Sequence, residues 1–145
     1  MLDPIMRTYD PKLIVITFGA IIFTGFAEGT FVQVTRSGDI FEKQKGADGS
    51  IDRINKNAFD FRVTATLKQT SLTNDLLSAA MTADMLTNLG ALPFLIKDLK
   101  GTTLFFAPQA WIAKDPDDEY GDSFGSREWQ FDTGVAEKFT GGSIL

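Results

Sequence analysis

The sequence predicts a mainly β protein, a β-sandwich or small barrel of antiparallel strands with one flanking α-helix. Three observations support this fold class. Residues 58–68 alternate apolar and polar side chains, which is typical of a strand with one buried face. Only residues 73–89 repeat apolar side chains at intervals of three and four, as an amphipathic helix does. Thirteen phenylalanines provide a large apolar area for a core in a chain with few helical segments.

The alternating strand is the clearest element, and we expect the rest of the chain to be organised around it and the helix that follows. Side chains alternate across a strand, so its two faces can be assigned directly. The face expected to be buried carries Phe59, Phe61, Val63, Ala65 and Leu67. The face expected to meet water carries Asp60, Arg62, Thr64, Thr66 and Lys68.

The helix is expected to begin at Ser71 or Thr73 and to end at Gly90. A hydroxyl at the first position accepts a hydrogen bond from a free backbone amide, and glycine readily adopts the left-handed conformation that ends helices. We expect Leu77 and Met81 to cover the sheet. The opposite face, predicted to point outward, carries Asp84 and Asn88.

Short β-rich segments account for most of the remaining chain, with Gly19 as a turn residue and Gly101 and Pro108 as breaks. Strands are predicted at 12–17, 20–24, 30–36, 94–97, 102–107, 109–113 and 126–133.

Residues 37–57 predict an extended hairpin of a different kind. Its two arms flank the turn Gly46-Ala47-Asp48-Gly49 and are highly charged. Its sparse large apolar residues are Ile40, Phe41, Ile51 and Ile54. The hairpin could cover its own barrel, as most connections do, or it could reach a neighbouring chain.

Composition excludes several classes of function. The 145 residues fit a single domain, 1–145, and neither cysteine nor histidine is present. Thiolate and histidine metal sites, and catalytic triads that use histidine, are therefore excluded. The net charge of −5 argues against an exposed duplex-DNA binder. The most apolar window, 13–26, is shorter than the roughly 20 residues of a membrane helix, and no signal peptide is recognisable.

The acidic loop, residues 114–125, is a candidate calcium site. Its alternating carboxylates are Asp115, Asp117, Glu119 and Asp122. An EF-hand loop also needs glycine at its sixth position and glutamate at its twelfth, where this chain has Tyr120 and Ser126. We expect a solvated turn and no cofactor. A competing hypothesis is a carbohydrate-binding β-sandwich that uses this loop with Ca²⁺, Trp111 and Trp129. No nucleophile–base pair can be assembled, so we expect no enzyme.

The order of several short motifs resembles the tail-tube proteins of contractile-tailed bacteriophages. The motifs are Gly25–Val32, the hairpin turn Gly46–Gly49, the strand end Leu67–Ser71 and the helix opening Asn74–Ser78. The resemblance implies a fold shared with the type VI secretion tube, in which six subunits close into a ring around a continuous inner β-barrel. Rings would stack into a tube that conducts the genome, and a type VI or phage-derived particle would share this fold.

This resemblance assigns expected roles to surfaces. The polar face of 60–68 would line the lumen or meet outside water, and we expect the lumen to be net negative or neutral so that DNA slides. The N-terminal arm 1–11 and the hairpin would join stacked rings. The candidate inter-ring residues are Ile40, Phe41, Ile51, Ile54, Ile144 and Leu145. Expected partners are further copies and the sheath, baseplate and tail-terminator proteins, in a virion made in the host cytoplasm, without a membrane.

Overall fold

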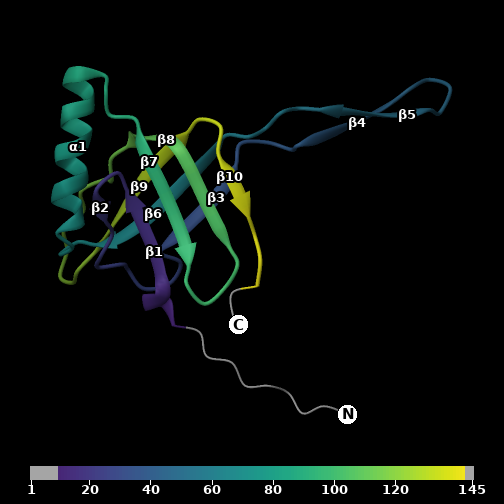
Figure 1. Cartoon of the computed structure of the whole chain (residues 1–145). Helices are drawn as coiled ribbons and strands as arrows, with labels where there is room; N and C mark the ends of the chain where they lie inside the picture. The colour runs from purple at the N-terminus through teal and green to yellow at the C-terminus, as the bar shows by residue number, and fades with distance from the viewer. Residues whose placement is uncertain (1–9, 143–145) are drawn as a thin grey trace, which may run out of the picture.

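The computed structural model describes residues 10–142 as one large antiparallel sheet, a separate two-stranded sheet and an α-helix (Figure 1). The eight-stranded sheet has the order β2-β1-β7-β8-β9-β6-β3, and β10 pairs with β8. Its strands are β1 (Ile14–Phe18), β2 (Ile21–Ile22), β3 (Val32–Arg36), β6 (Phe61–Lys68), β7 (Leu92–Asp98), β8 (Leu104–Lys114), β9 (Ser126–Thr133) and β10 (Glu137–Phe139). The small sheet pairs β4 (Phe41–Lys45) with β5 (Ile51–Asn55), and the helix is α1 (Thr73–Thr87). The mainly β prediction with one helix is confirmed.

The long strand β8 folds the sheet onto itself. Its first half pairs with β7 and β10, whereas its second half, from Ala110 onward, pairs with β9. This shared strand places β1 and β7 opposite β6 and β9, and the core lies between the two layers. Aromatic rings span the layers: Phe131 lies 5.2 Å from Phe18 and 5.0 Å from Phe94 between ring centroids. Such ring pairs add to the burial of apolar area that holds the layers together.

Strand β6 follows the predicted alternation from Phe61 onward. Phe61, Val63, Ala65 and Leu67 are all buried in the core. Phe59, predicted to join them, is instead 41% exposed and precedes the strand. The chain is still turning there, because Asn57 has a φ of 53° and its carbonyl accepts a hydrogen bond from the Phe59 amide.

Helix α1 runs from Thr73 to Thr87, so its start lies where it was predicted. Its N-cap is Leu72, which makes no side-chain capping hydrogen bond of the kind expected from a hydroxyl, and the helix ends before Gly90. Asn88 takes the left-handed conformation, with a φ of 57°. Gly90 is required for another reason: its amide donates to the Asp84 carboxylate at 2.9 Å, and a Cβ at this position would collide with the Asp84 side chain. Leu77 is fully buried and Met81 partly so, which confirms the predicted inner face.

Pro108 does not break β8, contrary to the sequence prediction. The strand runs from Leu104 to Lys114, and its register against β7 shifts between Ala107 and Ala110. Pro108 lies in this bulge, where the ladder does not require its missing amide hydrogen. Gly19 does form the predicted turn, with a φ of 60°, but the strand after it shortens to Ile21–Ile22.

The described residues include only part of each chain end. Pro11 begins a short 3₁₀ turn, Pro11–Leu13, at the end of the predicted N-terminal arm. The rest of that arm up to residue 9, and the candidate contacts Ile144 and Leu145, lie outside the described residues. In the stretch 10–142, the single helix falls short of the length and apolarity that a membrane crossing demands.

Candidate assembly surfaces

The outer face of β6 continues into a polar surface across three strands. Thr64 pairs with Gln33 of β3 on one side and with Gln130 of β9 on the other. Opposed residues in an antiparallel ladder share a face, so the surface can be read from the register. Its remaining members are Thr35, Arg62, Thr66, Lys68, Glu128 and Asp132. Asp60 lies just before the strand, where it accepts a hydrogen bond from Ser37 Oγ at 2.8 Å.

The Arg62 side chain on this polar surface is already paired. Its Nε and Nη2 donate to the two carboxylate oxygens of Asp132 at 2.8 and 3.1 Å, and its Nη1 donates to Gln130 at 3.2 Å. The hydrogen bonds to Asp132, aided by its charge, raise the pKa of the Arg62 guanidinium above its ordinary value. A guanidinium held in a bidentate pair has few donors left for a phosphate.

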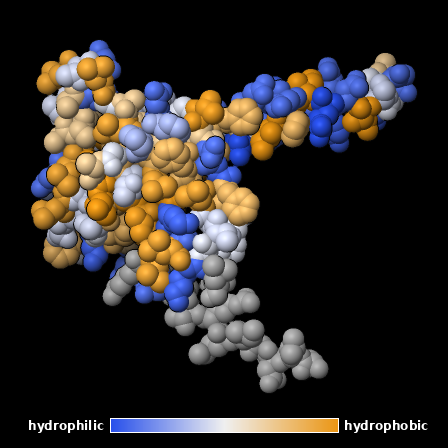
Figure 2. All heavy atoms as spheres, viewed as in Figure 1, coloured by the Kyte–Doolittle hydropathy of each residue, from blue (hydrophilic) through white to orange (hydrophobic). Residues whose placement is uncertain are grey.

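The hairpin β4–β5 leaves the body as an isolated arm (Figure 1). Every residue of both strands is exposed. Figure 2 shows apolar and charged side chains interspersed along its length. Its turn is tied by Asp48, whose carboxylate accepts from the Ser50 amide at 3.0 Å and the Ser50 hydroxyl at 2.6 Å. The predicted hairpin is confirmed, and it does not fold over its own barrel.

The two faces of the hairpin differ in charge. The register places Phe41, Lys43, Lys45, Ile51, Arg53 and Asn55 on one side, which we call the basic face. Arg53 lies over the Phe41 ring at 4.3 Å, consistent with this assignment. The other side carries Glu42, Gln44, Asp52 and Ile54, together with Ile40 and Lys56 at the base, where Lys56 pairs with Glu42 at 2.9 Å. The candidate contact residues are therefore divided between two faces.

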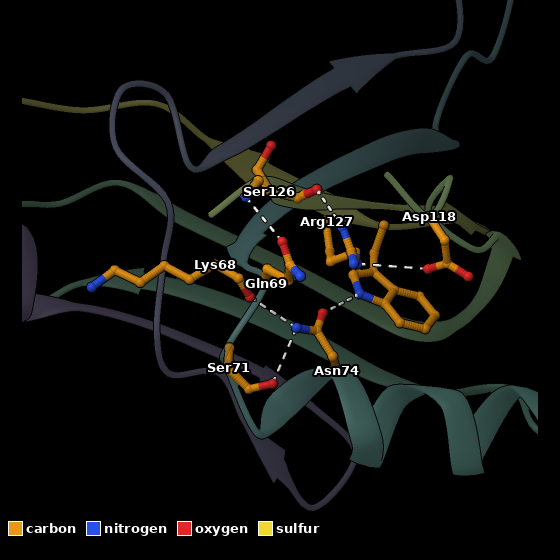
Figure 3. Close-up of polar contacts among 9 residues, drawn as sticks. Lys68, Gln69, Ser71, Asn74, Asp118, Ser126 and Arg127 are labelled. Carbon is orange, nitrogen blue, oxygen red and sulfur yellow. Dashed lines mark hydrogen bonds and ion pairs between the residues drawn. The ribbon is translucent and has the colours of Figure 1, made fainter. Parts of the chain in front are cut away.

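The acidic loop is held against the body at two places (Figure 3). The Gly125 amide donates to the Gln69 side chain at 3.0 Å. Arg127 is buried, and its Nε lies 3.6 Å from the Asp118 carboxylate, with the guanidinium 5.5 Å from the centroid of the Tyr120 ring. A buried guanidinium needs a charged partner, and Asp118 of the acidic loop supplies it. Arg127 thereby anchors the loop to β9.

A polar link joins β9 to the start of α1 beside this loop (Figure 3). The indole Nε1 of Trp129 donates to Asn74 Oδ1 at 2.9 Å. Asn74 in turn donates to the carbonyls of Lys68 and Ser71 at 2.9 and 3.1 Å. The arrangement satisfies the one polar atom of a buried indole and fixes the direction in which the helix leaves β6.

The outward surface of α1 is apolar rather than acidic. Asp84, predicted to face a partner, is half-buried and bonded to Gly90, and Asn88 ends the helix. The exposed large side chains there are Leu72, Leu76, Met85, Leu86 and Leu89. The sequence analysis did not identify this surface, because it expected Asp84 and Asn88 to form the outward face of the helix.

Two hollows lie beside β1, and both are lined by Ile14 of β1 and by Gly29 and Phe31, which precede β3. One, of about 710 Å³, is lined by apolar residues that include Ile16, Phe23 and Phe26. The other, of about 580 Å³, includes Val32, Val34 and Ile96. Within residues 10–142, β3 pairs on one side only, with β6. No local sequence pattern indicates this opening, because it depends on the order of strands in the sheet.

The competing binding-module hypothesis finds little support in the geometry. Trp129 is 2% exposed and belongs to the core, so it cannot stack on a sugar; Trp111 is 37% exposed. No cluster of three or more carboxylates among residues 10–142 is arranged to hold a metal ion.

Comparison with solved structures finds this fold in a tube-terminating cap and in a sheath–tube complex of contractile systems. The cap that terminates the anti-feeding prophage tube matches with a TM-score of 0.63 at 11% identity, covering 95% of this chain and 96% of that one. A chain of the PVC sheath–tube complex, an extracellular contractile injection system, matches with a TM-score of 0.62 at 8% identity over 91% of each. A chain of the gene transfer agent virion gives 0.60 at 9% identity, covering 92% of this chain and 100% of that one. The tail-tube resemblance is thus confirmed as a fold.

A protein related in sequence identifies the family of this chain. The structural protein ORF10 of Pseudomonas phage KPP10 is 33% identical over 135 residues, covering 84% of this chain and 75% of the relative. The chain therefore belongs to the family of this phage structural protein. No protein-family profile matches the chain.

Proposed function

We propose that the chain is a subunit of a phage tail tube, in which hexameric rings stack and conduct DNA during ejection. The observation that carries the proposal is the polar surface on β3, β6 and β9, found on a fold shared with a chain of a sheath–tube complex. Its kinship with a phage structural protein supports a structural role over catalysis. The proposal places the subunit in the virion.

The chemistry of the polar surface suits the wall of a DNA channel. DNA must slide, and unpaired cations would bind its phosphates and slow it. Here Arg62 is occupied by Asp132, and the carboxylates Asp60 and Glu128 accompany the remaining cation, Lys68. The surface is net acidic, which agrees with the lumen expected from the sequence.

The other surfaces then take complementary roles. The hairpin, with the N-terminal arm, would join stacked rings, and its exposed Ile51 and Ile54 would become buried there. The apolar outer side of α1, with Leu76 and Leu86, would face a sheath protein. Baseplate and tail-terminator proteins would bind the two ends of the tube.

The decisive experiment is negative-stain electron microscopy of the purified protein across a concentration series. Hollow rings or tubes are expected. A variant lacking Ile40–Ile54, closed with two glycines, should remain folded by circular dichroism and should not form tubes. Dispersed particles at every concentration, even after addition of a tail initiator complex, would refute the proposal.

The lumen assignment can be tested by freeing the paired guanidinium. The substitution Asp132→Asn should let Arg62 reach a phosphate, so duplex-DNA binding to assembled tubes should tighten at low salt. The slope of log affinity against log salt should steepen by about 0.9 for each additional phosphate that the protein neutralises. Asp60→Asn removes the same charge without freeing Arg62, and it serves as the matched control. Equal effects of both variants would show that pairing is irrelevant.

A further inference from the structure

The basic face of the hairpin concentrates cations that no carboxylate among the described residues neutralises. Lys43, Lys45 and Arg53 lie together there, and the register places no carboxylate beside them. Ion pairs within residues 10–142 include none of the three, although Lys56 on the opposite face is paired with Glu42. Phe41 and Ile51 share the basic face and are exposed. Such a mixed face, in an acidic protein, is suited to an acidic surface that also carries apolar groups.

The acidic loop is such a surface. Within the described part of the chain, Asp115, Asp117, Glu119 and Asp122 form no ion pair. A hollow of about 220 Å³ beside the loop is lined by four carboxylates, Asp115, Asp117, Glu119 and Glu128, and by one cation, Lys114. Tyr120 and Phe124 are 80% and 81% exposed. Because Arg127 and Gln69 anchor the loop, this surface is formed before any partner arrives.

The two surfaces lie at opposite ends of the same strand. The hairpin leads into β6 at Phe61, whereas the acidic loop ends beside Ser126, which pairs with Lys68 at the far end of β6. An eight-residue strand spans about 25 Å, so the surfaces of one chain cannot meet. Figure 1 shows the hairpin extending away from the side on which α1 lies. Contact between them requires a second copy.

We propose that the basic face of the hairpin docks on the acidic loop of a second copy of this chain. Lys43, Lys45 and Arg53 pair with the loop carboxylates Asp115, Asp117 and Glu119. Phe41 and Ile51 meet the exposed Tyr120 and Phe124. The contact joins two different surfaces, so it is heterologous and builds rings or stacks rather than closed pairs. This inference rests on the proposed function and names the contact that would build the assembly.

Nucleic acid is the other ligand that could bind a basic face, but the observations favour a protein partner. The face is interrupted by two large apolar side chains, and the body around it carries all of the net charge of −5, since the charges within 37–57 cancel. A matching acidic surface with exposed aromatic rings exists on the same chain. Electrostatic complementarity of this kind fixes register between partners.

Cysteine cross-linking tests the contact directly, because the chain contains no cysteine of its own. The double variant Lys45→Cys with Asp117→Cys should form disulfide-linked multimers under mild oxidation, seen as a ladder on a non-reducing gel. The matched control, Gln44→Cys with Asp117→Cys, places the first thiol on the opposite face of the hairpin and should remain monomeric. Equal ladders from both pairs, or none from either, would overturn the proposed docking.

Charge reversal supplies the second test. The variant Lys43→Glu, Lys45→Glu, Arg53→Glu should weaken self-association roughly 100-fold, because it juxtaposes like charges. A second variant keeps the wild-type hairpin and carries Asp115→Lys, Asp117→Lys and Glu119→Lys in the acidic loop. Neither variant should associate alone, and association should return when the two variants are mixed. The control Glu42→Lys, Asp52→Lys should change association little. Circular dichroism confirms that each variant is folded.

The outcomes separate this inference from the proposed function. Normal tubes from the reversed hairpin would leave the proposed function standing and overturn the docking. If the reversal instead abolished binding to a fluorescent 20-base-pair duplex and left assembly intact, the basic face would be a nucleic-acid surface, and the docking would again be wrong. Absence of tubes from the wild-type chain and of cross-links from the cysteine pair would overturn both.

Discussion

Two regions of this molecule use the same secondary structure with opposite results. In β6 and β9, alternate side chains are buried in the core, whereas in β4 and β5 every residue is exposed. Both regions are antiparallel ladders of similar regularity. The difference is that the body has a second layer to cover its apolar face and the hairpin has none. Alternation creates faces, and only a packing partner turns one of them into a core.

The comparison indicates that the hairpin is shaped for contact rather than for stability. An isolated two-stranded ladder is marginal in water. This one is reinforced locally, by the Asp48–Ser50 turn, the Arg53–Phe41 stacking and the Lys56–Glu42 pair. None of these interactions involves the body, so the arm and the body should respond independently to mutation.

The largest effect is expected in the body. Phe131→Ala should lower the free energy of unfolding by about 3–5 kcal/mol, because it removes a fully buried ring that contacts Phe18, Phe23 and Phe94. Urea denaturation followed by fluorescence measures it. A loss below about 1 kcal/mol would mean that the layers repack and the core is not organised around this ring.

A smaller effect is expected where β9 meets α1. Trp129→Phe keeps a buried aromatic ring but leaves Asn74 Oδ1 without its donor, which should cost about 1–3 kcal/mol. The substitution Asn74→Ala should cost a similar amount, and the double variant should cost less than the sum. Strictly additive losses would show that the hydrogen bond contributes nothing of its own.

The same type of truncation in the hairpin should barely change stability. Ile51→Ala and Ile54→Ala, at exposed positions, should each stay within about 0.5 kcal/mol of wild type in the monomer. Tube assembly, followed by light scattering, should nevertheless slow, and more for Ile51→Ala, because Ile51 lies on the basic face and Ile54 on the opposite one. A large loss of monomer stability would show that the arm packs on the body and would remove the contrast between the two regions.

The smallest effect concerns the hairpin turn and pH. Hydrogen bonds from Ser50 lower the pKa of the exposed Asp48 carboxylate below its ordinary value of 3.8. A lowered folded-state pKa means that the turn is supported above the unfolded-state value and loses this support as pH falls through the folded-state value. The NMR chemical shift of the Ser50 amide, followed against pH, should give a titration midpoint below 3.8. In Asp48→Asn this pH dependence should be lost. A midpoint at or above 3.8 would contradict the turn geometry.

Local pattern was sufficient to predict β6, β9, the hairpin and the start of α1. Each has a period set by neighbouring residues, and the burial of Val63 and Phe131 follows from that period alone. The predictions failed where contacts with residues distant in the sequence, or the local end of an element, override the pattern of neighbouring residues. Pro108 is tolerated because β7 accommodates a bulge opposite it, and Asn88 ends the helix before the glycine that was expected to do so.

The candidate surfaces were predictable only in part. The polar face of β6 could be read from alternation, but its neutralisation requires Asp132 opposite Arg62, a pairing across 70 positions of sequence. The charge difference between hairpin faces depends on register, which the turn fixes. The alternation of β9 places Arg127 on the buried face, but its partner Asp118 lies in a loop that no local pattern positions. The apolar outer side of α1 likewise depends on which helix residues pack against the sheet.

The placement of the hairpin and the acidic loop at opposite ends of β6 gives the subunit a direction. Any polymer built by head-to-tail contact between them has two unlike tips, one presenting free arms and the other presenting free acidic loops. Growth rates at the two tips need not be equal, and a single stopper protein could not close both. An assembly of this chain would need one partner that mimics the arm and another that mimics the loop.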